Sequence, residues 1–259
     1  MTARSVLRHL LNTRAGFDEA AACALPVIAN TLAPAIPSEE AGAVWKPPLP
    51  SMGSRRPTLR GKGSVRGSLV DETGRRELVF ESRLERGLAE MLLARHDVRE
   101  VRDQPPPVTY VDASGRTRTH TFDFLAATAD GRRVAFAVKP LAKVEHSGIM
   151  DTIALIRAQM GSRFADSYLL RTDRHITPDK VFNARLLLRS RRCRNEDDMA
   201  AIWAIAGNLP GTFKLADIVT QSKIGARGFN AIVALIDSGR LEPVGSARIG
   251  YLSSLRRAA

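Results

Sequence analysis

The chain has 259 residues and a formal net charge of +12, because 39 Lys and Arg residues outnumber 27 Asp and Glu residues. This length allows one sizeable core and a small second domain. The positive excess favours a polyanionic partner, although basic proteins of other kinds share it. Cys23 and Cys193 lie far apart, which argues against a disulfide framework or a zinc site and suits a reducing cytoplasm. The apolar run over residues 20–35 is broken by proline and too short to span a bilayer, so neither a membrane span nor a signal peptide is expected.

Basic residues gather in two runs. Residues 1–68 are punctuated by Pro and Gly and are expected to form a flexible basic arm. Residues 51–70 hold five basic side chains and no acid, and residues 185–194 hold five unopposed arginines. Each run can be a solvated face or a set of phosphate contacts. The predicted DNA contacts are Arg55, Arg56, Arg60, Lys62, Arg189, Arg191 and Arg192.

Residues 69–194 are expected to form an α/β domain. Apolar residues recur every four positions from Phe80 to Leu92, which predicts a helix there. Further helices are predicted over residues 149–160 and from Thr177 to about Leu188. Strands are predicted from Val98 to before Pro105, and over residues 108–111, 117–128, 132–138 and 167–170. The turn between the third and fourth of these strands makes them an antiparallel hairpin.

The last region, residues 195–259, has a different pattern. Helices are predicted over residues 196–206, 215–222 and 229–237, followed by strands over 241–244 and 248–252. Three helices and a β-hairpin are typical of a winged helix, although small helical bundles share the pattern. The third helix is unusually apolar for a reader of a DNA groove, which favours a protein contact or simple core packing there.

Asp123 is an acidic residue in an otherwise apolar stretch, Thr121–Leu125. A buried carboxylate is costly unless a cation or hydrogen-bond donors accompany it. The predicted hairpin places Asp123 near Ala137 and Lys139, which share a face of their strand. Asp123 and Lys139 can therefore be a structural ion pair or part of a site. His120 falls on the opposite face from Asp123 and is expected to be a packed or surface histidine.

Glu85 offers a second carboxylate. It flanks the apolar stripe of the first predicted helix, on the same side as Glu81. A divalent cation held by Asp123 and Glu85 would polarise a scissile phosphate and lower the pKa of a bound water. Lys139 would then orient that water or neutralise the charge that develops on phosphorus. The structural alternative for Glu85 is an exposed glutamate that pairs with nearby arginines.

Four short motifs occur in the order and spacing of a known family. They are Phe80–Glu85 (FESRLE), Arg102–Pro106 (RDQPP), His120–Leu125 (HTFDFL) and Val138–Pro140 (VKP). Over roughly residues 55–190 the chain resembles the TnsA endonuclease N-terminal family, in the PD-(D/E)xK nuclease superfamily. The resemblance implies a restriction-endonuclease-like α/β core, with a mixed central sheet flanked by helices. It also implies a metal-dependent endonuclease that nicks double-stranded DNA at transposon ends, beside an integrase-type transposase subunit and an AAA+ regulator.

The resemblance assigns roles by position. The family's catalytic residues fall on Glu85, Asp123 and Lys139. Its metal, Mg²⁺ or alternatively Mn²⁺, would be held by Glu85, Asp123 and the backbone carbonyl of Val138. Gln104 falls on the glutamine before a proline and would support the metal site or contact the DNA backbone. A C-terminal winged-helix-like domain in this family engages the ATPase partner.

Ala137 departs from the family pattern, which has Glu or Gln two positions before the lysine. Alanine offers no side-chain ligand, so this site would bind metal more weakly or belong to an inactive enzyme. The alternative function is therefore a catalytically weakened or inactive nuclease-fold adaptor that binds DNA. A stand-alone restriction-like or repair nuclease would share the chemistry and differ in its partners.

Overall fold

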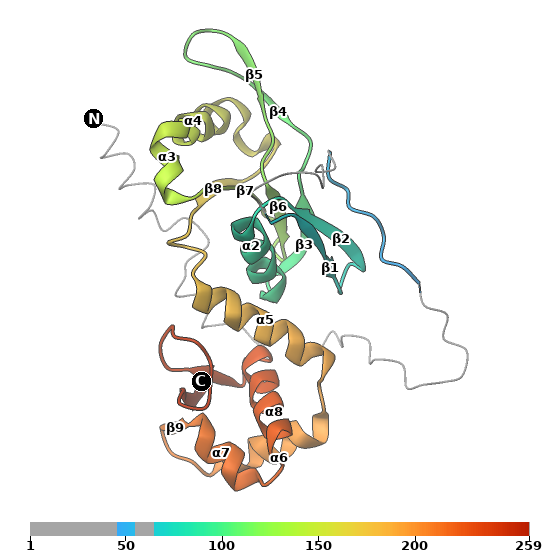
Figure 1. Cartoon of the computed structure of the whole chain (residues 1–259), viewed down its shortest axis with the longest axis vertical. Helices are drawn as coiled ribbons and strands as arrows, with labels where there is room; N and C mark the ends of the chain where they lie inside the picture. Colours follow the sequence, from blue (N-terminus) through green and yellow to red (C-terminus); the bar gives the residue numbers. More distant parts are fainter. Residues whose placement is uncertain (1–45, 55–64, 259) are drawn as a thin grey trace. The chain divides into compact units, whose positions relative to one another are not determined.

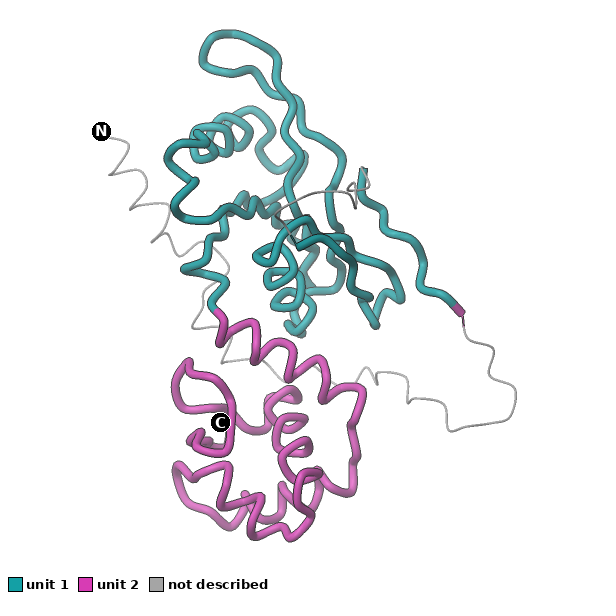
Figure 2. Tube along the Cα trace, viewed as in Figure 1, with its two compact units in different colours: residues 1–18, 47–177 teal, residues 19–46, 178–259 magenta. Residues whose placement is uncertain are grey.

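The structure, a computed structural model, describes residues 46–54 and 65–258. The described chain has a mixed α/β fold and divides into two compact units, Pro47–Thr177 and Pro178–Ala259 (Figures 1 and 2). Within the described residues, no helix is both long enough and apolar enough to cross a membrane. Four of the predicted DNA contacts lie outside the described residues: Arg55, Arg56, Arg60 and Lys62.

The first unit is built around a four-stranded mixed sheet. The order of the strands is β3-β6-β7-β8, with β7 and β8 parallel and the other neighbours antiparallel. The elements, in chain order, are β1 (Gly67–Asp71), β2 (Arg76–Phe80), α2 (Arg83–Ala94), β3 (Val98–Asp103), β4 (Val108–Val111), β5 (Thr117–His120), β6 (Phe124–Thr128), β7 (Arg133–Val138), α3 (Leu141–Ser147), α4 (Ile149–Met160), a 3-10 turn (Gly161–Arg163) and β8 (Ser167–Arg171).

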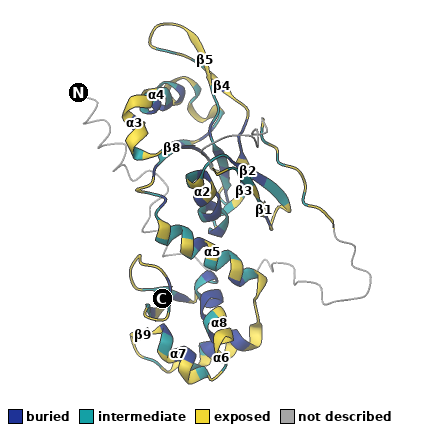
Figure 3. Cartoon of the chain, viewed as in Figure 1, coloured by how far each residue is buried: buried dark blue, intermediate teal, exposed yellow. Residues whose placement is uncertain are grey.

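Strand β7 lies in the interior of this unit. Its residues from Val134 to Val138 are all buried, as expected for a strand covered on both faces (Figure 3). On one face Ala135 and Ala137 pack with residues of α3 and α4 in a single apolar cluster. Helix α2 packs against β2 and β3. The hairpin predicted for β6 and β7 is confirmed, and Phe124 faces Phe136 in its register.

The first predicted helix begins later than its apolar pattern suggests. Phe80 is the last residue of β2, in a β1–β2 hairpin that the sequence pattern did not reveal. Helix α2 starts at Arg83 because Ser82 caps it, accepting the Glu85 N–H at 3.1 Å. The four-residue spacing of apolar residues therefore begins in a strand and continues into a helix. The prediction of one helix over Phe80–Leu92 is wrong at its start.

Strands β4 and β5 form a separate two-stranded ribbon. The prediction of one strand over residues 117–128 is therefore wrong: β5 belongs to the ribbon, β6 belongs to the central sheet, and Asp123 lies in the break between them. The side-chain amide of Gln159 in α4 bonds both the N–H and the C=O of Val111, at 2.8 Å each. The ribbon is thus hydrogen-bonded to α4, in addition to its chain connections to β3 and β6.

The second unit contains helices and a small antiparallel sheet of order β10-β11-β9. Its elements are α5 (Pro178–Arg192), α6 (Glu196–Gly207), β9 (Thr212–Lys214), α7 (Leu215–Ser222), α8 (Ala226–Asp237), β10 (Leu241–Pro243) and β11 (Ser254–Arg257). The three helices predicted for this region are present as α6, α7 and α8. A single core joins them to the sheet, with Ile202, Ile218 and Leu235 fully buried.

Two predictions about the second unit differ from the structure. The unit begins at Pro178 instead of residue 195, because α5 packs against α8. The strand predicted over residues 248–252 is wrong, because these residues belong to a loop and β11 follows them. The side chain of Asn183 in α5 holds this loop through the C=O of Ala247 at 3.0 Å and the N–H of Ile249 at 2.8 Å.

Candidate functional site

Asp123 lies where β5 ends and β6 begins, opposite the carboxyl end of β7. Its backbone N–H donates to the C=O of Phe136 at 2.9 Å, which extends the β6–β7 pairing by one residue. Its carboxylate accepts the backbone N–H of Val138 at 2.6 Å. The N–H and C=O of a strand residue point to the same edge, so the carbonyl of Val138 also faces the edge beside Asp123. These contacts agree with the predicted proximity of Asp123 to the end of β7.

Glu85 lies in the first turn of α2 and is only 8% exposed. Its carboxylate accepts the backbone N–H of Glu81 at 2.6 Å, just before the helix. Together with Ser82, which accepts the Glu85 N–H, this resembles a capping box, in which a Glu at the third helical position reaches back to the start of the helix. Glu85 therefore has a structural role as a cap, and it is not the exposed glutamate of the structural alternative.

The negative charge of Glu85 affects the pKa of Asp123. The pKa of Asp123 is raised to about 7, first by burial and second by the negative charge of Glu85. The Val138 N–H and the charge of Lys139 oppose this rise, and the charge of Glu81 adds a smaller increase. Coupling of this kind requires proximity, so the structure brings Glu85, Asp123 and Lys139 into one region of the first unit. A buried acid beside a second acid is a place where a bound cation would lower the energy.

Lys139 follows β7 directly and is partly exposed. Its backbone N–H donates to the C=O of Arg171 at 3.0 Å. Within the described residues its ammonium forms no ion pair, so the structural pair of Asp123 with Lys139 is not formed. Lys139 acts instead through its charge. This charge opposes the rise in the pKa of Asp123, and it adds to the effect of burial in lowering the pKa of His120.

His120 is packed, as expected. Its ring meets that of Phe122 edge-on with centroids 4.8 Å apart. Burial is the first cause that lowers its pKa, and the charge of Lys139 is the second. Its buried Nε2 has no hydrogen-bond partner among the described residues.

Gln104 lies beside Asp123 in an unusual backbone conformation. It is 3% exposed and its φ is +41°, a region that non-glycine residues rarely occupy. Its N–H donates to the C=O of Asp123 at 3.0 Å, and its C=O accepts the N–H of Ser54 at 2.8 Å. Strained residues of this kind persist where surrounding contacts hold them and often occur at functional sites.

Ala137 is 3% exposed and belongs to the apolar cluster beneath α3 and α4. In the β7–β8 pairing it faces Leu170. The position at which the resemblance described above expects a Glu or Gln is thus occupied here by a core residue. A longer polar side chain at position 137 would start among apolar neighbours, which is consistent with the alanine found there.

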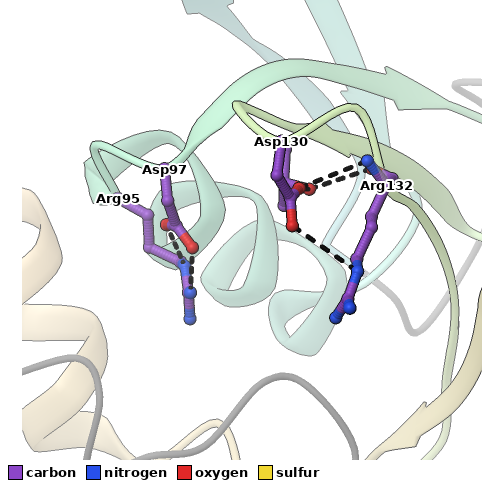
Figure 4. A network of polar contacts seen from close by, with 5 residues as sticks. Arg95, Asp97, Asp130 and Arg132 are labelled. Carbon is purple, nitrogen blue, oxygen red and sulfur yellow. Dashed lines mark hydrogen bonds and ion pairs between the residues drawn. The ribbon is translucent and has the colours of Figure 1, made fainter.

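At the opposite end of the β6–β7 hairpin, Asp97 and Asp130 each pair with an arginine (Figure 4). Arg95 binds Asp97 at 2.8 Å, and Asp130 accepts the Arg132 N–H at 3.3 Å and pairs with its guanidinium at 3.5 Å. The pKa of Asp130 is lowered, first by its hydrogen bond from Thr128. Asp130 is exposed and Asp97 partly exposed, and both are paired with an arginine, whereas Asp123 has a second acid for a neighbour.

The predicted DNA contacts in α5 have different surroundings. Arg189 and Arg192 are exposed. Arg191 is bound to Asp237 of α8 through hydrogen bonds of 2.9 to 3.2 Å, and the carboxylate is 5% exposed. This ion pair occupies the guanidinium that was predicted to contact DNA and gives it a role in fastening α5 to α8.

No group of three or more His, Cys, Asp and Glu side chains in the described part of the chain is gathered tightly enough to hold a metal ion. A metal at Asp123 and Glu85 would therefore need backbone carbonyls and water as further ligands, which hard cations accept. No model of a known protein family matches the chain, and no curated protein matches it either.

Proposed function

We propose that the chain is a metal-dependent DNA endonuclease subunit that nicks double-stranded DNA at transposon ends. The observation that carries the proposal is the proximity of two carboxylates, Glu85 and Asp123, to the ammonium of Lys139, which forms no ion pair within the described residues. Glu85 is buried, and desolvation and then the charge of Glu85 raise the pKa of Asp123. The order of these residues, on a helix, just before β6 and just after β7, supports a restriction-endonuclease-like core. The mixed sheet supports it as well.

In this proposal Glu85, Asp123 and the Val138 carbonyl hold Mg²⁺, with Mn²⁺ as an alternative. When bound, the ion supplies Lewis acidity to a phosphate oxygen and acidifies a ligated water. The chain's own contribution is to hold the two carboxylates in one region of the first unit, with the Val138 N–H fixing the orientation of Asp123. Lys139 offers a positive charge to the phosphate as negative charge develops on it. Gln104 supports Asp123 through the backbone.

The second unit is proposed to be winged-helix-like. Its order of α6, β9, α7, α8 and the β10–β11 hairpin supports this, and α5 is an addition. Helix α8, at the place of a groove-reading helix, contacts α5, α6, α7 and β10 and is buried along most of its length. A helix enclosed in this way is poorly suited to enter a DNA groove. We therefore assign this unit to contacts with protein partners, namely an integrase-type transposase subunit and an AAA+ regulator.

The second candidate function is a nuclease-fold adaptor that binds DNA without cutting it, or cuts it weakly. The burial of Ala137 in an apolar cluster favours this alternative, because it removes one acidic or amide ligand from the site. Both functions predict DNA binding, and only the first predicts metal-dependent strand cleavage.

Nicking of supercoiled plasmid with Mg²⁺ or Mn²⁺ distinguishes the two functions. The full chain is assayed alone and with its neighbouring transposition proteins, beside the Asp123→Asn and Glu85→Gln variants. Asp130→Asn is the matched control, since Asp130 is an exposed acid of the same hairpin. The endonuclease proposal expects nicking by the wild type and by the control, and at least a hundredfold loss in both site variants, the order of magnitude for a lost electrostatic catalytic group.

Two results would overturn the proposal. One is DNA binding without nicking under every metal and partner combination, which would favour the adaptor. The other is nicking that survives Asp123→Asn unchanged, which would place the activity elsewhere or in a contaminant.

A further inference from the structure

A second buried acid, Asp103, lies one residue before Gln104 at the end of β3. It is 1% exposed, and its Oδ2 accepts the hydroxyl of Ser51 at 2.7 Å and the backbone N–H of Val79 at 3.0 Å. Its Oδ1 is buried and has no hydrogen-bond partner among the described residues. A buried carboxylate without a cation costs stability, and its hydrogen bonds to Ser51 and Val79 offset part of that cost.

The contacts of Asp103 lead towards both acids of the proposed site. On one side it holds Val79 near the end of β2, two residues before Glu81, whose N–H binds the Glu85 carboxylate at 2.6 Å. On the other side the chain passes directly to Gln104, whose N–H binds the C=O of Asp123 at 3.0 Å. One carboxylate thus connects the segment that carries Glu85 with the segment that carries Asp123.

The segment Pro47–Ser54, here called the strap, completes this connection. Leu49 pairs with β2, because its N–H donates to Arg75 and its C=O accepts the N–H of Glu77, each at 2.8 Å. Ser51 then binds Asp103, and the N–H of Ser54 binds the C=O of Gln104 at 2.8 Å. The strap therefore runs from β2 to the strained residue beside Asp123 and holds that residue in its left-handed conformation.

We propose that Asp103 is a positioning residue which, through the strap, fixes the distance between Glu85 and Asp123. This inference rests on the proposed function, because these acids are the ligands of the proposed metal. The rival reading is that the Asp103 contacts are ordinary internal hydrogen bonds that stabilise the first unit as a whole. The two readings differ in which backbone amides become exposed to solvent when the connection is cut.

Amide hydrogen exchange tests whether Asp103 couples the two segments. Exchange is measured by NMR on the full chain in the absence of metal. Ser51→Ala removes the donor to Asp103. Ser54→Ala is the matched control: it removes the hydroxyl contact of Ser54 to the C=O of Pro105 at 3.3 Å, but leaves Asp103 and the backbone contact of Ser54 to Gln104 in place. We expect Ser51→Ala to speed exchange of the Glu81 and Gln104 amides about tenfold, as expected for loss of a hydrogen bond to a charged group. Exchange in the centre of β6 and β7 stays unchanged. Asp103→Ala produces the same pattern more strongly.

Equal acceleration of all amides in the first unit would overturn the inference in favour of general stabilisation. Acceleration of Gln104 alone would also overturn it, since Glu85 would then be independent of Asp103. A parallel Mn²⁺ titration by electron paramagnetic resonance separates this inference from the proposed function. Severalfold weaker binding in Ser51→Ala supports positioning for metal. A wild type that binds no Mn²⁺ contradicts the proposed function, while the exchange pattern still decides whether Asp103 couples the two acids.

Discussion

Two acids, Asp237 and Asp123, one in each unit, have opposite surroundings. Asp237 in the second unit is bound to the guanidinium of Arg191 by several hydrogen bonds. Asp123 in the first unit accepts one backbone N–H and has a second carboxylate nearby, and burial followed by the charge of Glu85 raises its pKa to about 7. The second unit thus neutralises its buried charge with its own residues. The first unit leaves two carboxylates close together at a sheet end, which is where the proposed cation would bind.

Among the substitutions that test this comparison, removal of Arg191 is expected to change the free energy of unfolding most. Arg191→Ala leaves Asp237 buried without its partner, so the free energy of unfolding should fall by about 3 kcal/mol or more. Urea denaturation measures the change. Arg194→Ala is the control, because the Arg194–Glu196 pair is exposed and should contribute at most about 1 kcal/mol. Equal losses in both variants would remove the distinction between a neutralised and a surface acid.

Substitution of Ala137 tests the apolar side of the proposed site. Ala137→Glu places a carboxylate in the cluster under α3 and α4, so unfolding should become easier by about 2 kcal/mol without metal. Addition of Mg²⁺ should recover part of this loss if the new carboxylate reaches the cation. Ala137→Leu controls for volume and should show no recovery. A gain of nicking in Ala137→Glu would identify the natural chain as a weakened enzyme.

The pH dependence of stability reports on Asp123 directly. Between the ordinary pKa of an aspartate and about 7, the folded protein holds a proton that the unfolded chain has released. This group's contribution to stability therefore falls as pH rises through that window and is constant above it. Asp123→Asn should be more stable than the wild type at pH 8 by on the order of 2 kcal/mol, and the gain should disappear near pH 4.

Denaturant unfolding at both pH values checks this prediction, with Asp130→Asn as the control. Because the pKa of Asp130 is lowered and not raised, its amide variant should show no gain at high pH. If Asp123→Asn and the wild type respond to pH in parallel, Asp123 is an ordinary acid and the contrast with Asp237 is lost.

Metal binding should have the smallest effect on stability. A cation that binds only the folded protein stabilises it by mass action, and Mg²⁺ at about five times its dissociation constant adds roughly 1 kcal/mol. Thermal unfolding with and without Mg²⁺ measures this shift in the wild type. Glu85→Gln should abolish the shift, whereas Glu90→Gln, on the same helix, should retain it. Stabilisation that persists in Glu85→Gln would move the cation away from the two coupled acids.

Local patterns in the sequence predicted the parts of the fold that depend on local forces. Helices α4 and α7 match the predicted residues, and glycines at positions 148 and 161 flank α4. The closeness of Asp123 to the end of β7 followed from the turn at residues 129–131, since a hairpin's register is set by its turn. The capping pattern Ser82–Glu85 was also present in the sequence and would have given the correct start of α2.

Other features depend on partners that are distant in the sequence. The acid Asp103 is held by Ser51 and Val79, which are 52 and 24 residues away, and no local pattern connects them. Arg191 looked like part of a basic run because its partner in α8 is separated from it by 46 residues. The resemblance to a nuclease family pointed to the acids of the proposed site, but the contacts that orient them appear only in three dimensions.

The amide of Gln159 has a consequence for the solubility of the first unit. A ribbon of two strands normally presents unpaired N–H and C=O groups along its outer edge, which can recruit a strand from another chain. At Val111 both groups are already satisfied by this one side chain. Gln159 thus occupies at this residue the place that a third strand would take, and it limits unwanted self-association along β4 without adding charge.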